Sequence, residues 1–211
     1  MPKKIKRWLF KHFQNNFIMY FIISITFAIG IIVGAITIKM LGAEEKNEIM
    51  LFLNSFFKAV DNNDLNNMSI FKQSILDNFE AIIMIWISSI IYIGIFIVPI
   101  IILFRGFALG FSVGFFVCEY GIKGFLFSIL GIFPQNLLII PGMISIASMG
   151  MAFSFNRIKI RKLRMRNKNT TSNIVDYSIS ILIFSILVFI GCLIEAYLAP
   201  TFLTLLTDYL N

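Results

Sequence analysis

Residues 17–38 read FIMYFIISITFAIGIIVGAITI, a run of 22 residues without a charged side chain. An α-helix rises about 1.5 Å per residue, so this run reaches across the roughly 30 Å hydrocarbon core of a bilayer. It is longer than the apolar core of a signal peptide and has no clear small-residue cleavage site, so we expect a retained first span. Lys and Arg side chains between Lys3 and Lys11 precede it. The positive-inside rule therefore places the amino terminus in the cytoplasm.

The composition extends this interpretation to the whole chain. Of its 211 residues, 58% are hydrophobic and 14% are charged, whereas a soluble domain is about 45–50% apolar and about 25% charged. The formal net charge is +7, but seven of the 18 Lys and Arg lie between Arg157 and Lys168, next to apolar blocks. Such clusters orient a membrane protein, so they do not indicate nucleic-acid binding. The sequence predicts an all-α polytopic protein with a single membrane domain over residues 1–211.

Four further apolar blocks predict the remaining spans. Residues 81–103 would return to the cytoplasm, with a kink at Pro99, and Arg105 would mark the cytoplasmic interface. Residues 106–122 are short, so a thin span and a re-entrant helix both remain open. Either one returns the chain to the cytoplasm before the basic loop. The predicted spans are 17–38, 81–103, 106–122, 136–155 and 177–199, with a basic cytoplasmic loop at 156–173 and an external carboxyl terminus.

The longest polar stretch follows the first span and suits the external side. Residues 39–80 hold seven acidic residues against four Lys. Ile49, Leu53 and Val60 recur at helical spacing, and the pattern resumes after residue 64. We expect an external amphipathic helical hairpin at 43–80 that presents a partner-docking surface. Its candidate docking residues are acidic or aromatic: Glu44, Glu48, Phe56, Phe57, Asp61, Asp64 and Phe71.

Two sets of glycines recur four residues apart within apolar segments. Gly30 and Gly34 lie in the first span, and Gly106, Gly110 and Gly114 follow Arg105. Small residues at this spacing allow two helix backbones to approach closely in lipid. Packing within one chain and a homo-oligomer interface both remain open.

Polar residues near apolar segments are candidates for function. Glu195 lies near the outer end of the last predicted span, and an intramembrane acid is a functional candidate by default. Pro134, Gln135 and Asn136 form a predicted helix break, with Pro141 a short distance beyond. The simplest role of the two amides is to satisfy backbone groups freed by that break. A polar substrate site is the alternative.

No constellation of residues indicates catalysis. The single histidine, His12, lies in the basic amino-terminal segment, and the sequence contains no His-Glu metal motif, nucleophile elbow or phosphate loop. The external carboxylates are scattered and show no paired acid–base arrangement. We expect a non-enzyme with no catalytic residues, no cofactor and no metal site.

Several short motifs carry a resemblance that covers nearly the whole chain. They are Asp77-Asn78, Arg105-Gly106-x-x-x-Gly110-Phe-x-x-Gly114, Gly124, Phe133-Pro134-Gln135-Asn136, and Pro141. With these motifs the chain resembles the stage II sporulation protein M family of endospore-forming bacteria. The resemblance implies a non-enzymatic scaffold in the mother-cell or septal membrane that acts in engulfment of the forespore. It also implies two peptidoglycan-degrading partners, stage II sporulation proteins D and P, and we expect a homodimer.

A second hypothesis comes from a different functional class. Broken helices near the middle of a membrane frame substrate sites in transporters, and Gln135, Asn136 and Glu195 are the residues that would line such a site. A continuous polar cavity across the membrane would favour a small-solute or ion transporter or channel. A sealed, Phe-rich interior would favour the scaffold. Relatives in the broader superfamily often carry a Pro-His-Gly-type break, where this chain has Gln135 and Asn136.

Overall fold

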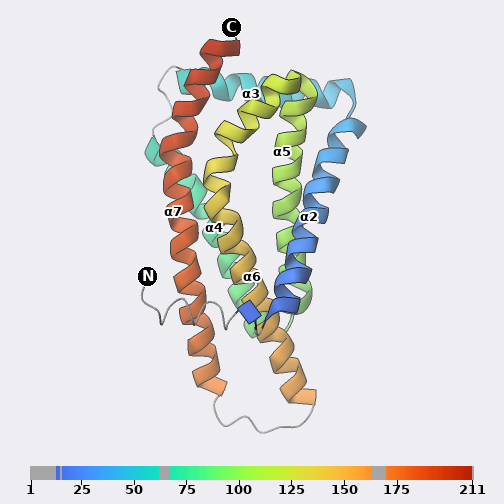
Figure 1. The fold of residues 1–211 in the computed structure, drawn as a ribbon, viewed down its shortest axis with the longest axis vertical. Helices are drawn as coiled ribbons and strands as arrows, with labels where there is room; N and C mark the ends of the chain where they lie inside the picture. The colour runs from blue at the N-terminus through green and yellow to red at the C-terminus, as the bar shows by residue number, and fades with distance from the viewer. Residues whose placement is uncertain (1–12, 15, 62–66, 163–169, 211) are drawn as a thin grey trace.

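The computed structural model describes residues 13–14, 16–61, 67–162 and 170–210. All regular secondary structure in these residues is helical, which confirms the all-α prediction. The helices, shown in Figure 1, are α2 Phe17–Met40, α3 Ala43–Asp61, α4 Asn67–Ile90, α5 Gly94–Gly131, α6 Phe133–Lys162 and α7 Thr170–Leu210.

Five long helices run alongside one another, and α3 lies across one end of the bundle (Figure 1). We call this end the α3 end. The opposite end, where α6 carries Arg157 and Lys159, is called the basic end. The carboxyl terminus lies at the α3 end (Figure 1). Helices α2 and α5 are parallel, because Gly30 lies against the backbone of Leu103 and Gly34 lies against that of Phe107.

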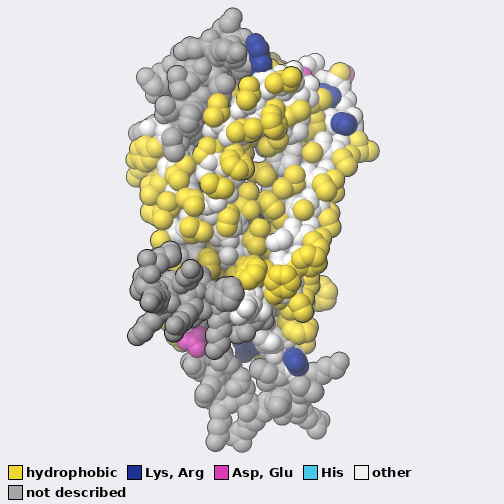
Figure 2. All heavy atoms as spheres, in the orientation of Figure 1, with side chains coloured by type: hydrophobic (Ala, Val, Ile, Leu, Met, Phe, Trp, Pro, Cys, Tyr) yellow, Lys and Arg dark blue, Asp and Glu magenta, His cyan; other side chains and the backbone are white. Residues whose placement is uncertain are grey.

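Four of the helices are long and apolar enough to cross a membrane: α2, α5, α6 and residues 174–197 of α7. Figure 2 shows hydrophobic side chains covering the visible face between Lys and Arg atoms near its two ends. Helix α4 runs with these four helices but carries Lys72, Asp77 and Glu80, so its composition is not that of an ordinary span. The predicted count of five apolar spans is therefore not confirmed. The bundle instead contains four apolar helices and an amphipathic fifth.

The prediction of one span over residues 81–103 is wrong. Helix α4 ends at Ile90, and α5 begins at Gly94. Tyr92, in the turn between them, has a φ of 72°, in the left-handed region that L-residues rarely adopt. The guanidinium of Arg157 stacks 4.8 Å from the Tyr92 ring centroid and lies 3.5 Å from the Ile90 carbonyl. The cation therefore meets the exposed carbonyl end of α4, a favourable position for positive charge.

The predicted external hairpin over 43–80 is wrong in its second half. Helix α3 lies outside the bundle as expected, but residues 67–80 form the first part of α4. The Phe71 ring packs edge-on against Phe189 of α7, with 5.8 Å between centroids. Neither Gly nor Pro occurs between Asn67 and Ile90 to stop the helix. The segment therefore continues into the bundle.

The prediction of a separate short segment over 106–122 is also wrong, because these residues belong to the 38-residue helix α5. The helix bends sharply at Gly121, where φ is 58° and ψ is −131°, a backbone geometry that favours glycine. Beyond the bend the chain folds back, so that Gly124 lies against the carbonyl oxygen of Phe116. The expected spans 136–155 and 177–199 fall within the longer helices α6 and α7. Of the predicted loop 156–173, residues 156–162 are helical and 163–169 lie outside the described residues.

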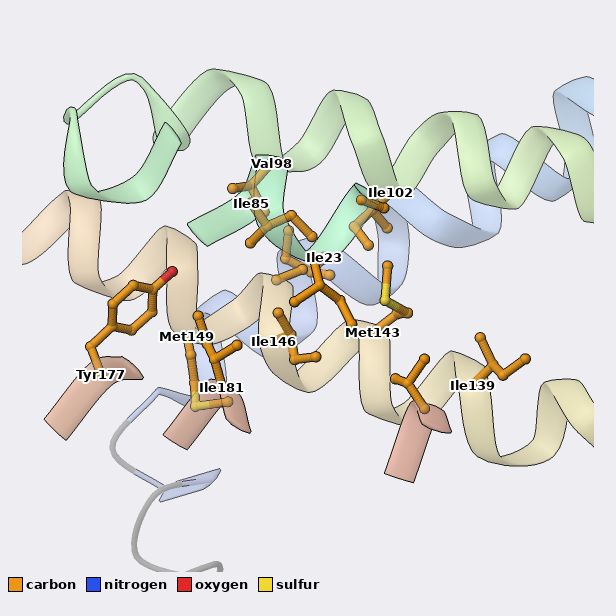
Figure 3. Packing of buried hydrophobic residues seen from close by; sticks show 14 of the residues in the cluster. Ile23, Ile85, Val98, Ile102, Ile139, Met143, Ile146, Met149, Tyr177 and Ile181 are labelled. Carbon is orange, nitrogen blue, oxygen red and sulfur yellow. The ribbon is translucent and has the colours of Figure 1, made fainter. Parts of the chain in front are cut away.

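A core of buried apolar side chains fills the bundle on the side toward the basic end. Ile23, Ile85, Val98 and Ile146 are 0% exposed and come from four different helices. Figure 3 shows these side chains beside Met149 and Ile181 with their apolar ends directed toward one another. This packing closes that part of the bundle.

Candidate functional site

Arg105 lies inside the bundle, so the prediction of an interfacial arginine is wrong. It is about 16 Å along α5 from Gly94, at a rise of about 1.5 Å per residue. Its neighbour Gly106 packs against the backbone of Phe27, which lies in the middle of α2. The guanidinium is therefore near the midpoint of the membrane-spanning helices. A charge at that depth requires partners inside the protein.

Helix α4 supplies those partners. Arg105 donates from Nη1 to Asn78 Oδ1 at 2.6 Å and from Nη2 to the Asp77 backbone carbonyl at 2.6 Å. One turn earlier, Ser74 Oγ donates to Glu195 Oε2 of α7 at 2.5 Å. Asn78 Nδ2 donates to the Ser74 carbonyl at 2.8 Å, which locks the asparagine in place. The side chains of α4 thus hold a cation and an anion at successive turns.

These charged groups border a cavity of about 790 Å³ between the helices. This volume lies within the range of about 300–1,000 Å³ typical of small-molecule sites. The residues lining it include charged side chains from three helices, which are Asp77, Glu80, Arg105 and Glu195. Its walls are otherwise largely apolar, with Phe27, Ile101, Ile139, Ile140 and Met143 among them. The lining does not reach Ile146, although the buried apolar cluster that contains Ile146 also contributes Ile139 and Met143 to the cavity wall.

The predicted helix break forms the junction between α5 and α6. Pro134 lies in the first turn of α6, a position that needs no backbone N–H. Gln135 Nε2 donates to the Gly131 carbonyl at 2.6 Å, and Asn136 Nδ2 donates to the Ile132 carbonyl at 2.7 Å. Both amides also line the cavity, whereas Pro141 lies within α6 with an exposed side chain. One junction therefore supplies backbone partners and two polar cavity residues.

Gln135 has one group without a partner. Its side chain is 5% exposed, and its Oε1 has no hydrogen-bond partner in the part of the chain that the structure describes. A buried unsatisfied acceptor costs about 1–3 kcal/mol. Gln135 therefore contributes to the cavity lining while its amide oxygen has no partner among the described residues.

The glycines predicted to pack helices lie at the contact between α2 and α5. A Cβ on Gly30, Gly34, Gly106 or Gly110 would overlap the backbone of the facing helix, and one on Gly114 would lie 3.0 Å from Ala35 Cα. These glycine faces are therefore covered within one chain. A second copy of the chain would have to use another surface.

The predicted docking residues are not gathered at one place. Glu44 and Glu48 are exposed on α3, whereas Phe71 is half-buried in α4 against α7. Asp64 lies outside the described residues, as do the side chains of Phe56, Phe57 and Asp61.

Sequence reasoning missed the α4 side of the cavity. Gln73, Asp77 and Glu80 recur with spacings of four and three residues, which places them on one helix face. Gln73 Nε2 donates to Asp77 Oδ1 at 2.8 Å. This polar stripe at the start of an apolar block was the available signal. The pattern of residues 43–80 alone places these three residues in the external hairpin.

The described residues contain no group of three His, Cys, Asp or Glu side chains that could hold a metal ion. The site is a mixed-charge cavity with apolar walls.

Comparison with known proteins gives one finding on identity. The sequence profile of the family described as Stage II sporulation protein M matches residues 23–200. No curated protein and no solved structure matches the chain. The match includes every residue of the cavity and most or all of each of the four apolar helices. The chain is a membrane protein related to sporulation, and it belongs to the stage II sporulation protein M family.

Proposed function

We propose that this protein is a non-enzymatic scaffold of the engulfment machinery in the mother-cell or septal membrane. It would recruit and localise the peptidoglycan hydrolases, stage II sporulation proteins D and P, through α3 at the external face. The observation that carries the proposal is the position of α3 across the end of the bundle, with Glu44 and Glu48 exposed (Figure 1). A helix held flat against a membrane-embedded bundle offers a docking surface to proteins that act outside the membrane.

Helix α3 packs against α7, and two side-chain contacts also link it to α5. Tyr120 donates its hydroxyl hydrogen to Met50 Sδ at 3.2 Å, and Lys46 Nζ lies 3.9 Å from Cys118 Sγ. Both contacts lie just before the bend at Gly121. The docking surface is therefore joined to a spanning helix, so a partner bound there would be fixed relative to the membrane.

The scaffold proposal is tested by co-purification from sporulating membranes. Glu44→Lys/Glu48→Lys reverses the charge of the exposed face of α3 without deleting any helix, and Lys159→Gln at the basic end is the matched control. We expect the intact protein and the control to retain the hydrolases, and the α3 variant to lose most of them. If the intact protein retains neither hydrolase, the scaffold proposal fails. Equal retention by all three proteins would exclude α3 as the docking surface.

The scaffold requires the α3 end to face outward. A cysteine at Glu48 should react with a membrane-impermeant maleimide in intact protoplasts, whereas a cysteine at Lys159 should react only after permeabilisation. The exposed Cys118 is first replaced by serine in both variants, and the buried Cys192 serves as the unreactive internal reference. The reverse labelling pattern would place α3 in the cytoplasm and remove the proposed contact.

The proposal also includes a homodimer through a surface outside the α2–α5 contact. The mass of the protein in nanodiscs tests it, and the mass of a single copy would contradict it.

Transport of a small solute or ion is a second candidate, and the cavity is the observation that favours it. Gln135, Asn136 and Glu195 all line this cavity. The packed side chains of Ile85, Val98 and Ile146 lie between the cavity and the basic end, so the described residues form no continuous path. The scaffold is therefore favoured over the transporter. Flux through protein reconstituted into liposomes distinguishes them, and we expect no flux above that of protein-free liposomes.

A further inference from the structure

We propose that the cavity binds a small zwitterion with an apolar side chain, such as a free amino acid or a short peptide. Its carboxylate would bind Arg105, its ammonium group would bind the carboxylates, and its side chain would contact the apolar walls. This proposal is about ligand binding alone, so it holds whether or not the protein acts as a scaffold or as a transporter.

The hydrogen bonds of Arg105 leave capacity for a ligand. A guanidinium has five N–H donors, and the two hydrogen bonds from Arg105 go to an amide oxygen and a backbone carbonyl, both neutral. Arg105 also lines the cavity. A planar guanidinium with free donors can bind a carboxylate through two parallel hydrogen bonds. Such charge-assisted hydrogen bonds are about twice as strong as those between neutral groups. This geometry favours an anionic group on the ligand.

The other charges favour a cationic group on the same ligand. Three carboxylates and one guanidinium line the cavity, so a ligand that carried only negative charge would meet excess repulsion. Asp77 already accepts a hydrogen bond from Gln73, and Glu195 accepts one from Ser74. Glu80 is exposed to the open space and has no such bond among the described residues. Glu80 is therefore the carboxylate best placed to receive an ammonium group.

The spacing of the charges suits a compact ligand. Arg105 is held by Asn78 of α4, and the carboxylates Asp77 and Glu80 lie one residue before and two residues after Asn78. One helical turn is about 5.4 Å. A compact zwitterion bound to Arg105 therefore stays within about one turn of both carboxylates along the axis of α4.

The walls and the volume define the rest of the ligand. Ile101, Ile139 and Met143 provide apolar surface beside the charged groups. A cavity of about 790 Å³ is larger than a single small amino acid needs, so it also accepts a short peptide. The absence of a three-residue metal group among the described side chains argues against a bare metal ion as the occupant.

The test uses three probes that share one apolar group. L-Leucine carries both charges, 3-methylbutylamine lacks the carboxylate, and 4-methylpentanoate lacks the ammonium group. Binding to the full chain in nanodiscs is measured by calorimetry, with thermal stabilisation as a second readout. Because each charge-assisted hydrogen bond changes affinity by about tenfold or more, we expect L-leucine to bind at least about tenfold more tightly than either analogue.

Two matched variants assign the binding to the cavity. Glu80→Gln keeps the side-chain size and removes a charge from the lining, whereas Glu119→Gln does the same on α5 outside the cavity. We expect the first to weaken L-leucine about tenfold and the second to leave it unchanged. Equally tight binding of the amine, no binding of any probe, or equal effects of the two variants would each overturn the proposal. Hydrolase co-purification is measured on the same variants, so failure of this site is distinguishable from failure of the scaffold.

Discussion

Substitution of Gly110 by alanine should destabilise the bundle, because the α2–α5 contact leaves no space for a methyl group. A Cβ at Gly110 would overlap the Ile31 carbonyl oxygen and lie 2.7 Å from both Ile31 Cα and its carbonyl carbon. Ordinary contact begins at 3.4 Å, so the two carbon atoms alone require the helices to separate by about 0.7 Å, and the closer carbonyl oxygen requires more. The atoms it meets belong to the backbone and cannot rotate away. Overpacking of this kind costs about 1–3 kcal/mol.

The matched control is Gly42→Ala, where the nearest atom to a Cβ is Glu45 Oε2 at 3.7 Å. Reversible unfolding in mixed detergent micelles measures both variants. We expect Gly110→Ala to lose about 1–3 kcal/mol and Gly42→Ala to change much less. Equal stabilities would refute the close α2–α5 contact. A change in oligomeric mass at unchanged stability would assign the glycine face to an interface between copies.

Three further substitutions test other parts of the structure. Asn78→Leu removes the side-chain acceptor of Arg105 and should cost about 1–3 kcal/mol of unfolding free energy, measured in the same micelles. Arg157→Gln removes the cation that stacks on Tyr92 and should cost about 0.5–1 kcal/mol, with faster proteolysis at the α4–α5 turn as a second readout. Gly121→Ala forces a side chain into a strained backbone conformation and should cost about 1–3 kcal/mol, and an unchanged melting temperature would argue against the bend.

The apolar helices were predictable because their signal is one of length and composition. An uncharged run such as 17–38 has to be helical in lipid, since only a helix satisfies all its backbone groups locally. The same argument identified the cores of α6 and α7. The glycine repeats identified faces of close approach, but the sequence could not say which helix lay opposite.

The turn between α4 and α5 was missed because its residues resemble those of a span. Ile91, Tyr92 and Ile93 are all apolar, and only Gly94 indicates a possible break. Turn prediction relies on polar or Pro/Gly clusters, which are absent here. Arg157, which stacks on Tyr92, lies far along the chain. A stabilising contact of that kind has no local signature.

The depth of Arg105 was misjudged for a related reason. A lone arginine beside an apolar block is read as interfacial, because its long side chain can reach water. Once the turn moves to 91–93, the same arginine falls in the middle of α5. Its acceptors on α4, which are the Asn78 side chain and the Asp77 backbone carbonyl, then become necessary. Because the turn was missed, the sequence analysis placed the buried Asn78 and the half-buried Arg105 at the surface.

The charges inside the bundle are better explained by binding than by stability. A charged residue at the centre of a spanning helix costs about 2.5–3.5 kcal/mol on insertion scales, and apolar residues of similar volume often replace buried charges without loss of stability. Arg105 and Glu195 are each bonded by α4, but Glu80 faces open space. Packing alone therefore accounts for neither the cavity nor the acid that borders it. A ligand that binds both Arg105 and Glu80 would account for the cavity and for the acid at its border.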